Sequence, residues 1–211
     1  GLGTEHEKAR VLYEWVGTQV RYNADWHFGV HGYKPFSAGA VFARCIGDCK
    51  DKAILLCTML EIAGIKAYPV IINLEEFRGC EDITLPMPHH FNHAIACIEY
   101  ADGKLQFVDG TATYSGFDEL PSYDAGADVI VVKPDGGVRM LVPQLTPEQN
   151  QDIDTIEAEC IGGGTLRIQV TRTAAGGACA GLRSGFLRPG DRKRQLELEY
   201  SRHFPGAKVA E

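Results

Sequence analysis

The chain has 211 residues, of which 45% are apolar and 23% are charged, and these fractions argue for a globular protein rather than a disordered, collagen-like or coiled-coil chain. The formal net charge is −7, whereas a nucleic-acid-binding surface usually needs a basic stripe. The basic run at 188–194 is followed directly by Glu197 and Glu199, so we interpret it as a solvated helix face. The longest aliphatic run is far shorter than the ~20 residues of a membrane span. We therefore expect no nucleic-acid partner, and no membrane contact is visible in this fragment.

Two helices are predicted in the first third of the chain. Residues 5–20 carry apolar side chains at spacings of three and four, after a possible capping box of Thr4 and Glu7. Residues 21–47 are rich in glycine and are predicted to be irregular, and long loops of this kind are often functional. The second helix is predicted over 49–63, where a wide apolar surface indicates burial on most sides.

Short runs rich in β-branched and aromatic residues predict four strands, at 67–72, 92–100, 105–109 and 128–133. Pro69 favours an edge position, or a place early in its strand. Asp102 and Gly103 predict a hairpin between the second and third strands.

A polar, proline-bearing segment at 143–152 predicts a boundary between two domains, 1–145 and 146–211. The second is expected to be β-rich, with a hairpin around 162–164 and a helix at about 191–203. Two strands and one helix do not easily enclose a hydrophobic core. We therefore expect this second unit to be incomplete. A first residue other than Met agrees with an excised fragment.

Among the seven cysteines, Cys49 is the one whose position is explained least well by a role in packing. The seven cysteines are odd in number and contain no Cys-x-x-Cys pair, which argues against a disulfide scaffold. Cys49 follows Gly47 and Asp48 at the start of a helix, with Asp48 as a natural N-cap. The free N–H groups and dipole of a helix start favour a thiolate, but they lower a thiol pKa by only about one unit. A thiolate that dominates at neutral pH also needs a cationic partner, usually a histidine.

His93 is the best candidate for that partner, because it lies just inside an apolar strand, and Asp109 closes the next strand. The pairing register decides whether the two meet, since side chains alternate between the faces of a strand. A two-residue turn puts them on opposite faces. A three-residue turn with a left-handed Gly103 makes Asp109 a same-face diagonal neighbour of His93. Taken singly, each residue also fits an ordinary role: an inert thiol, a core histidine, a strand-end aspartate.

Three segments resemble the motifs of the transglutaminase-like superfamily, and most closely those of its bacterial cysteine protease branch. They are 44–53, which contains Gly-Asp-Cys-Lys-Asp-Lys, 91–94 and 108–111. The upstream segments 20–22 and 32–35 fit the same branch, so that the resemblance covers about residues 5–140. It implies an α+β, papain-like fold, in which a helix with the nucleophile packs on an antiparallel sheet with its partners.

The resemblance implies that Cys49 is the nucleophile, His93 the general base and acid, and Asp109 the residue that orients the imidazole. The Cys49 N–H would be one oxyanion donor. The indole N–H of Trp26 could be the second, although a packed loop anchor explains Trp26 equally well. Cys45 has no expected role beyond packing, and a disulfide between Cys45 and Cys49 would silence the enzyme.

The leading hypothesis is thiol-dependent acyl transfer on amide bonds of a peptide or protein substrate. Hydrolysis by a protease or amidase is favoured, because no amine pocket is recognisable. Protein cross-linking by a transglutaminase and a catalytically idle binding or scaffold domain are the alternatives.

No cofactor and no metal are expected. His89 and His93 have the spacing of zinc ligands on a helix, but the prolines before them and the strand pattern that follows oppose a helix. The acidic residues at 75–82 lack the spacing of a calcium loop. The oligomeric state and compartment stay open, and the resemblance leans toward a bacterial periplasm or cell envelope.

Overall fold

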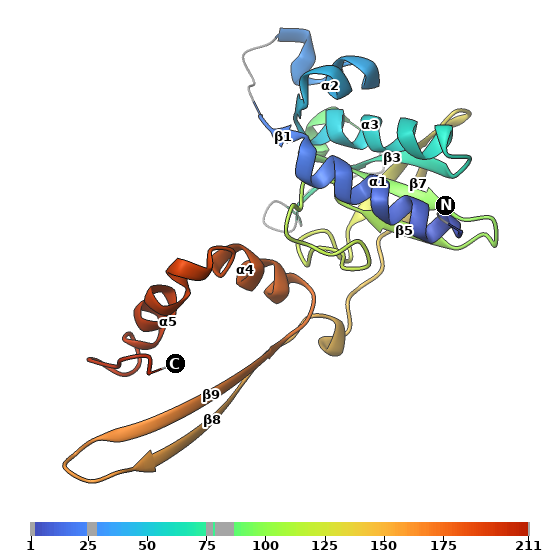
Figure 1. The fold of residues 1–211 in the computed structure, drawn as a ribbon. Coiled ribbons are helices and arrows are strands. Elements are labelled where there is room, and N and C mark those ends of the chain that lie inside the picture. Colours follow the sequence, from blue (N-terminus) through green and yellow to red (C-terminus); the bar gives the residue numbers. More distant parts are fainter. Residues whose placement is uncertain (1–2, 25–28, 75–77, 79–86, 211) are drawn as a thin grey trace. The chain divides into compact units, whose positions relative to one another are not determined.

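The structure is a computed structural model that describes residues 3–24, 29–74, 78 and 87–210. The chain divides into two compact units, Gly1–Thr146 and Pro147–Glu211, whose elements are drawn in Figure 1. Across the described ranges, no helix combines the length and the apolar character that a membrane span requires.

Three α-helices belong to the first unit: α1 (Glu5–Gln19), α2 (Ala38–Arg44) and α3 (Cys49–Ile62). The predicted capping box of Thr4 and Glu7 at the start of α1 is confirmed, and so is the N-cap of α3 at Asp48. Helix α2 lies in the segment predicted to be irregular. It has seven residues, too few for an apolar period to stand out, and the Ser37 side chain caps it.

A five-stranded antiparallel sheet forms the centre of the first unit, in the order β5-β4-β3-β6-β7. Its strands are β3 (Lys66–Ile72), β4 (His93–Glu99), β5 (Leu105–Val108), β6 (Asp128–Lys133) and β7 (Gly136–Leu141). Two short strands, β1 (Arg21–Tyr22) and β2 (Ile46–Gly47), pair in parallel apart from this sheet. Strand β7 was not predicted, because it begins with two glycines and is largely exposed, so it has no alternating apolar pattern.

Pro69 was predicted to mark an edge strand or an early strand position, but β3 is the central strand and Pro69 is the fourth of its seven residues. The pairing of β3 with β6 begins only at Val70, opposite Val131. Pro69 therefore lies just before the β3–β6 ladder, although it is paired with Ala96 on the β4 side.

Of the two turns considered between β4 and β5, the structure contains the bulged one, which the triad requires. Tyr100 N–H donates to the Lys104 carbonyl at 2.9 Å, and Gly103 adopts a left-handed φ of 82°. Ala96 consequently lies opposite Val108. This is the register that brings Asp109 to the same side as His93.

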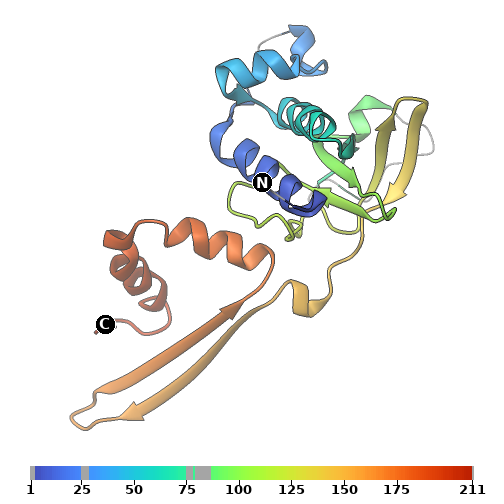
Figure 2. The same cartoon turned by 45° about the vertical axis from the view of Figure 1, so that its right-hand side comes forward.

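Helix α3 packs on β3 and β4, and α1 lies beside α3 on the same face of the sheet (Figures 1 and 2). On this face, Ala96 and Ile98 of β4 pack in one core cluster with Leu56 of α3. On the opposite face, Ile95 and Cys97 of the same strand join a second cluster. Burial of β4 on both sides fixes the strand that carries His93.

The second unit contains the β8–β9 hairpin, visible as a long ribbon in Figure 2, and two helices. Its elements are β8 (Asp152–Cys160), β9 (Leu166–Ala174), α4 (Gly177–Gly185) and α5 (Arg192–Tyr200). The predicted hairpin and the helix near 191–203 are present, whereas α4 was missed because three glycines interrupt its sequence. All residues of these four elements are described, and none of them is buried. Short 3-10 helices occur at Gly29–Gly32, Pro88–His90, Pro147–Gln149 and Pro189–Asp191.

Candidate active site

The start of α3 is fixed by a reciprocal pair of hydrogen bonds. Asp48 Oδ1 accepts from Asp51 N–H at 3.2 Å, and Asp51 Oδ2 accepts from Asp48 N–H at 3.3 Å. Gly47 allows this close approach, because a Cβ there would lie 2.7 Å from the Cβ of Asp51. Cys49 is thereby held as the first residue of α3, where its N–H has no partner within the helix.

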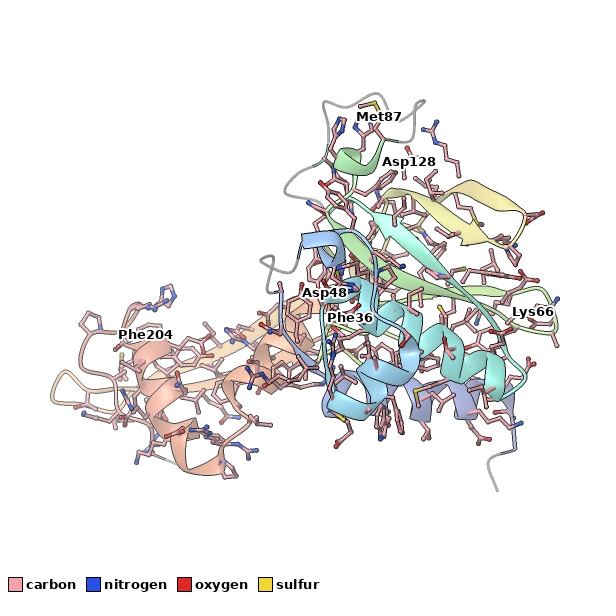
Figure 3. The ribbon with its side chains drawn as sticks, turned by 90° about the horizontal axis from the view of Figure 1, so that it is seen from above. Phe36, Asp48, Lys66, Met87, Asp128 and Phe204 are labelled. Carbon is pink, nitrogen blue, oxygen red and sulfur yellow. The ribbon has the colours of Figure 1, made fainter. Side chains whose placement is uncertain are left out.

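Asp51 also ties the preceding segment to this helix start. Its Oδ1 accepts from Phe36 N–H at 2.8 Å, and its Oδ2 lies 3.3 Å from the guanidinium of Arg44 in α2. Figure 3 labels Phe36 and Asp48 near one another at this end of α3. Asp51 is 3% exposed, so these donors satisfy a buried carboxylate.

The Cys49 side chain meets both the sheet and β1. It packs against Ala53 of its own helix and Ala94 of β4, the residue after His93. Tyr22 lies opposite Gly47 in the β1–β2 pairing, and its hydroxyl is hydrogen-bonded to the Cys49 side chain. Burial first, and then the neighbouring Cys49, raise the pKa of the Tyr22 phenol. Cys45 and Cys49 are both free thiols.

His93 and Asp109 lie at one end of the sheet, because His93 begins β4 and Asp109 directly follows β5. His93 Nε2 is 3.2 Å from Asp109 Oδ2, which leaves Nδ1 as the ring nitrogen available to Cys49. The N–H and hydroxyl of Thr111 donate to Asp109 Oδ1 at 2.8 and 2.7 Å. The Tyr123 hydroxyl donates to Asp109 Oδ2 at 3.3 Å. Both oxygens of the carboxylate are therefore occupied and its orientation is fixed.

The charges of this group favour an imidazolium. Burial lowers the pKa of His93, but hydrogen bonds to Asp109 and Cys49 outweigh it and raise that pKa to about 10. Burial would raise the pKa of Asp109, and the bonds from His93 and Thr111 hold it below its ordinary value. The Asp109 side chain is 0% exposed, whereas the His93 side chain and Cys49 are each 8% exposed. Of the three residues, Asp109 is therefore the most deeply buried.

Lys52 is a buried cation that the sequence motif alone did not assign to the site. It is 1% exposed, and its Nζ donates to the Val20 carbonyl at 2.9 Å. Burial lowers the pKa of Lys52 to about 8, while the charge of Asp109 opposes that shift. Lys52 therefore links α3 to the segment before Tyr22 and adds positive potential near Asp109.

Asp124 was also missed, because Tyr-Asp-Ala-Gly reads as an ordinary turn. His93, Asp109 and Asp124 each offer one ligand atom, and these atoms lie within 4.8 Å of one another. Among the described residues, this is the group whose chemistry comes nearest to a metal-ligand set. Asp109 already accepts hydrogen bonds at both oxygens, so a cation would have to displace some of these donors.

Other residues singled out from the sequence are not part of this group. Trp26, the possible second oxyanion donor, lies outside the described residues, as do the acidic residues at 75–77 and 79–82. His89 lies in a 3-10 helix and His93 begins β4, so the two do not share a helix as zinc ligands at this spacing would.

Comparisons with known proteins agree with this fold. The profile of the transglutaminase-like superfamily matches residues 1–100. No curated protein matches the chain. A similar solved structure, from Parabacteroides distasonis ATCC 8503, is a protein proposed to be a protease. It shares 15% identity with a TM-score of 0.53, over 78% of this chain and 32% of that one. Another, a proposed cysteine protease from Cytophaga hutchinsonii, shares 14% identity with a TM-score of 0.36, over 81% of this chain and 43% of that one.

The chain thus spans less than half the length of either solved relative. The likeness to the Parabacteroides structure concerns the fold, which agrees with the predicted α+β architecture of helices on an antiparallel sheet. The matched profile agrees with the resemblance found in the motifs, over residues 1–100. Residues 1–100, just under half of the chain, are thus similar to the transglutaminase-like superfamily.

Proposed function

We propose that the protein is a cysteine-dependent enzyme in which Cys49, His93 and Asp109 catalyse acyl transfer on amide or peptide bonds, with hydrolysis as the outcome. The observation that carries this proposal is the meeting of three distant residues at one end of the sheet. His93 Nε2 lies 3.2 Å from Asp109 Oδ2, and the imidazole is hydrogen-bonded to Cys49 as well. The protease function proposed for the Parabacteroides relative supports the same reaction class.

In the first half of the reaction, the Cys49 sulfur attacks the carbonyl carbon of the substrate and forms a carbon–sulfur bond. The negative charge that develops on oxygen is stabilised by the free N–H of Cys49 at the start of α3. As the carbon–nitrogen bond breaks, the His93 imidazolium gives its proton to the leaving amine. The products are a thioester on Cys49, a free amine and a neutral imidazole.

In the second half, neutral His93 takes a proton from water while the water oxygen attacks the thioester carbon. The carbon–sulfur bond breaks, a carboxylic acid leaves, and the thiolate–imidazolium pair is restored. Asp109 keeps the imidazole oriented in both halves, because its own carboxylate is fixed by Thr111 and Tyr123. The Tyr22 hydroxyl contacts the sulfur and can help to hold its rotamer.

Alkylation with iodoacetamide at pH 6 tests the thiolate directly. Cys49 is expected to react faster than exposed Cys160, although Cys49 is 8% exposed, because a thiolate rather than accessibility determines the rate. His93→Gln should slow the labelling of Cys49 and leave that of Cys160 unchanged. Labelling of Cys49 no faster than Cys160 would contradict the proposal and favour an idle scaffold.

The acyl transfer itself can be tested with p-nitrophenyl acetate. The protein should release p-nitrophenol and carry an acetyl thioester on Cys49, detectable by mass spectrometry and cleaved by hydroxylamine. Cys49→Ala should lose both signals, whereas the matched variant Cys45→Ser should keep them. Addition of glycine ethyl ester then separates the two acceptors: acetate as the product indicates hydrolysis, and the acetylated amine indicates a cross-linking activity.

A further inference from the structure

Asp124 is a buried carboxyl group that the proposed triad does not use. It is 0% exposed, and neither of its carboxylate oxygens has a hydrogen-bond partner among the described residues. A ligand atom of Asp124 nevertheless lies within 4.8 Å of one on His93 and one on Asp109. An unpartnered carboxylate is costly in such a place, so its charge must be removed or balanced.

The backbone around Asp124 is anchored, so the carboxyl group cannot easily turn out to solvent. Its N–H donates to the Pro121 carbonyl at 3.0 Å. The Arg78 guanidinium donates to the carbonyls of Tyr123 and Ala125, the residues on either side, and the bond to Ala125 is 2.7 Å long. The hydrogen bonds that Arg78 makes here go to the backbone, so it contributes charge to Asp124 but no direct hydrogen bond.

Within the part of the chain that the structure describes, five titratable or charged groups act on Asp124. Asp109 and His93 approach from the end of the sheet, Arg78 from the segment before β4, and the phenols of Tyr13 and Tyr123 from α1 and from the same turn. Burial, and then the charge of Asp109, raise the pKa of Asp124 to about 8, and His93 and Arg78 only partly oppose this shift.

A proton is the neutralising partner that this geometry favours. A divalent cation would need Asp109 as a shared ligand, and both Asp109 oxygens already accept hydrogen bonds. A proton on Asp124 needs no rearrangement of these bonds. The Asp109–His93 pair then faces one neutral acid instead of a second carboxylate.

We propose that Asp124 is a positioning residue of this site, which holds a proton at neutral pH and, when it loses that proton in alkaline solution, keeps the His93 imidazolium charged. In the neutral form, Asp109 is the only carboxylate acting on His93 from this side. When Asp124 is ionised, a second negative charge within 4.8 Å stabilises the protonated form of His93 and so raises its pKa. The two groups therefore titrate as a coupled pair, and the imidazolium persists to higher pH than Asp109 alone would allow.

The catalytic role of the His93 imidazolium rests on the proposed function. The coupled titration of Asp124 and His93 does not depend on catalysis, so it is tested in the Cys49→Ala protein. Imidazole NMR with chelator present follows the titration of His93 with and without Asp124→Asn, and His93→Gln assigns the signal. The pKa of His93 should fall by about one unit, a tenfold loss of proton affinity, in Asp124→Asn. The matched variant Asp135→Asn removes the same charge from the exposed β6–β7 turn and should not shift it. An equal His93 titration in all three proteins would overturn the proposal.

A second measurement leaves Asp124 in place, so it holds even if Asp124→Asn does not fold. With aspartate labelled with ¹³C at the side-chain carboxyl, one aspartate should remain protonated at pH 7, and it should titrate together with His93. Ionisation of every aspartate below pH 6 would refute the inference. In protein that retains Cys49, cleavage of an acetyl p-nitroanilide, whose leaving amine needs the imidazolium proton, should decline at a lower pH in Asp124→Asn than in the unaltered chain. Acetylation that survives Cys49→Ala would instead refute the proposed function and leave the NMR result valid.

Discussion

The two units of the chain differ in what holds them together. In the first unit, both faces of the sheet are covered by apolar clusters, and the residues proposed for catalysis lie at the end of that sheet. In the second unit, the hairpin and both helices have no buried residue. Its ordered contacts are polar instead: the guanidinium of Arg172 binds Asp154 and Glu199.

This contrast teaches that the proposed site depends on apolar packing rather than on the polar contacts of the second unit. Burial of β4 on both faces fixes His93, and the capping bonds of α3 fix Cys49. Changes in the first unit should therefore have large effects on activity or stability. Equivalent changes in the second unit should have small ones.

The largest expected effect follows from Asp109→Asn. An amide cannot hold the imidazolium as a carboxylate does, so acetylation of Cys49 should fall by about 10³–10⁴-fold. Asp152→Asn makes the same chemical change in the second unit, on a residue 3.4 Å from Arg172, and should leave the rate within twofold. Rates of p-nitrophenol release compare the two. A similar loss of p-nitrophenol release in both variants would show that the activity depends on the second unit as much as on the first.

Matched leucine truncations measure the packing difference. Leu56→Ala removes a side chain that is 0% exposed in α3, and it should lower the free energy of unfolding by about 3–5 kcal/mol. Leu166→Ala in β9 removes one that is 46% exposed, and it should cost less than about 1 kcal/mol. Urea unfolding followed by far-UV circular dichroism is suitable, because it reports both units, whereas both tryptophans lie within residues 1–146 and their fluorescence would follow the first unit alone. Equal costs would show that the hairpin is buried in solution.

The sequence predicted those parts of the fold that local patterns encode. The N-cap of α3 depends on a few adjacent residues and is confirmed, and the bulged turn at Gly103 is one of the two turns that the sequence left open. Helices α2 and α4 were missed, because glycines and short length hide an apolar period.

The candidate site divides in the same way. Cys49, His93 and Asp109 stand in recognisable motifs, and the bulged-turn register, which follows from Gly103, brings the last two together. Asp124 and Lys52 owe their surroundings to tertiary packing. From the sequence, an aspartate in a turn and a lysine in a helix are expected to be exposed to solvent, and it is the tertiary fold that buries Asp124 and Lys52.

The pH dependence of stability tests whether the buried acid weakens the first unit. The pKa of Asp124 is about 8 when folded, against about 3.9 in an unfolded chain. Between these values the folded protein binds more protons than the unfolded one, so this group makes stability fall as pH rises from about 4 to 8. Asp124→Asn removes that loss and should stabilise the protein by about 2–4 kcal/mol at pH 7.

Below pH 4 the stabilisation by Asp124→Asn should vanish, because Asp124 is then protonated in both states. Urea unfolding at pH 4 and pH 7 gives the comparison. Asp135→Asn, on the exposed turn, controls for the change in net charge. A stabilisation of the same size at both pH values would mean that packing, and not the proton, is responsible.

The smallest effect is expected where polar contacts act without a core. Arg172→Ala removes ion pairs to Asp154 at 2.6 Å and Glu199 at 2.7 Å, and it should lower the local stability of the second unit by about 1 kcal/mol. Arg167→Ala in the same strand breaks a 3.5 Å pair with Glu159, in which both side chains are more than two-thirds exposed, and should have almost no effect. Amide hydrogen exchange of β9 and α5 reports these local changes. Because salt screens exposed charges, the difference between the two variants should shrink in 1 M NaCl. A difference that persists at high salt would instead indicate that the alkyl part of Arg172 packs against the hairpin, and that the second unit is held by more than its charges.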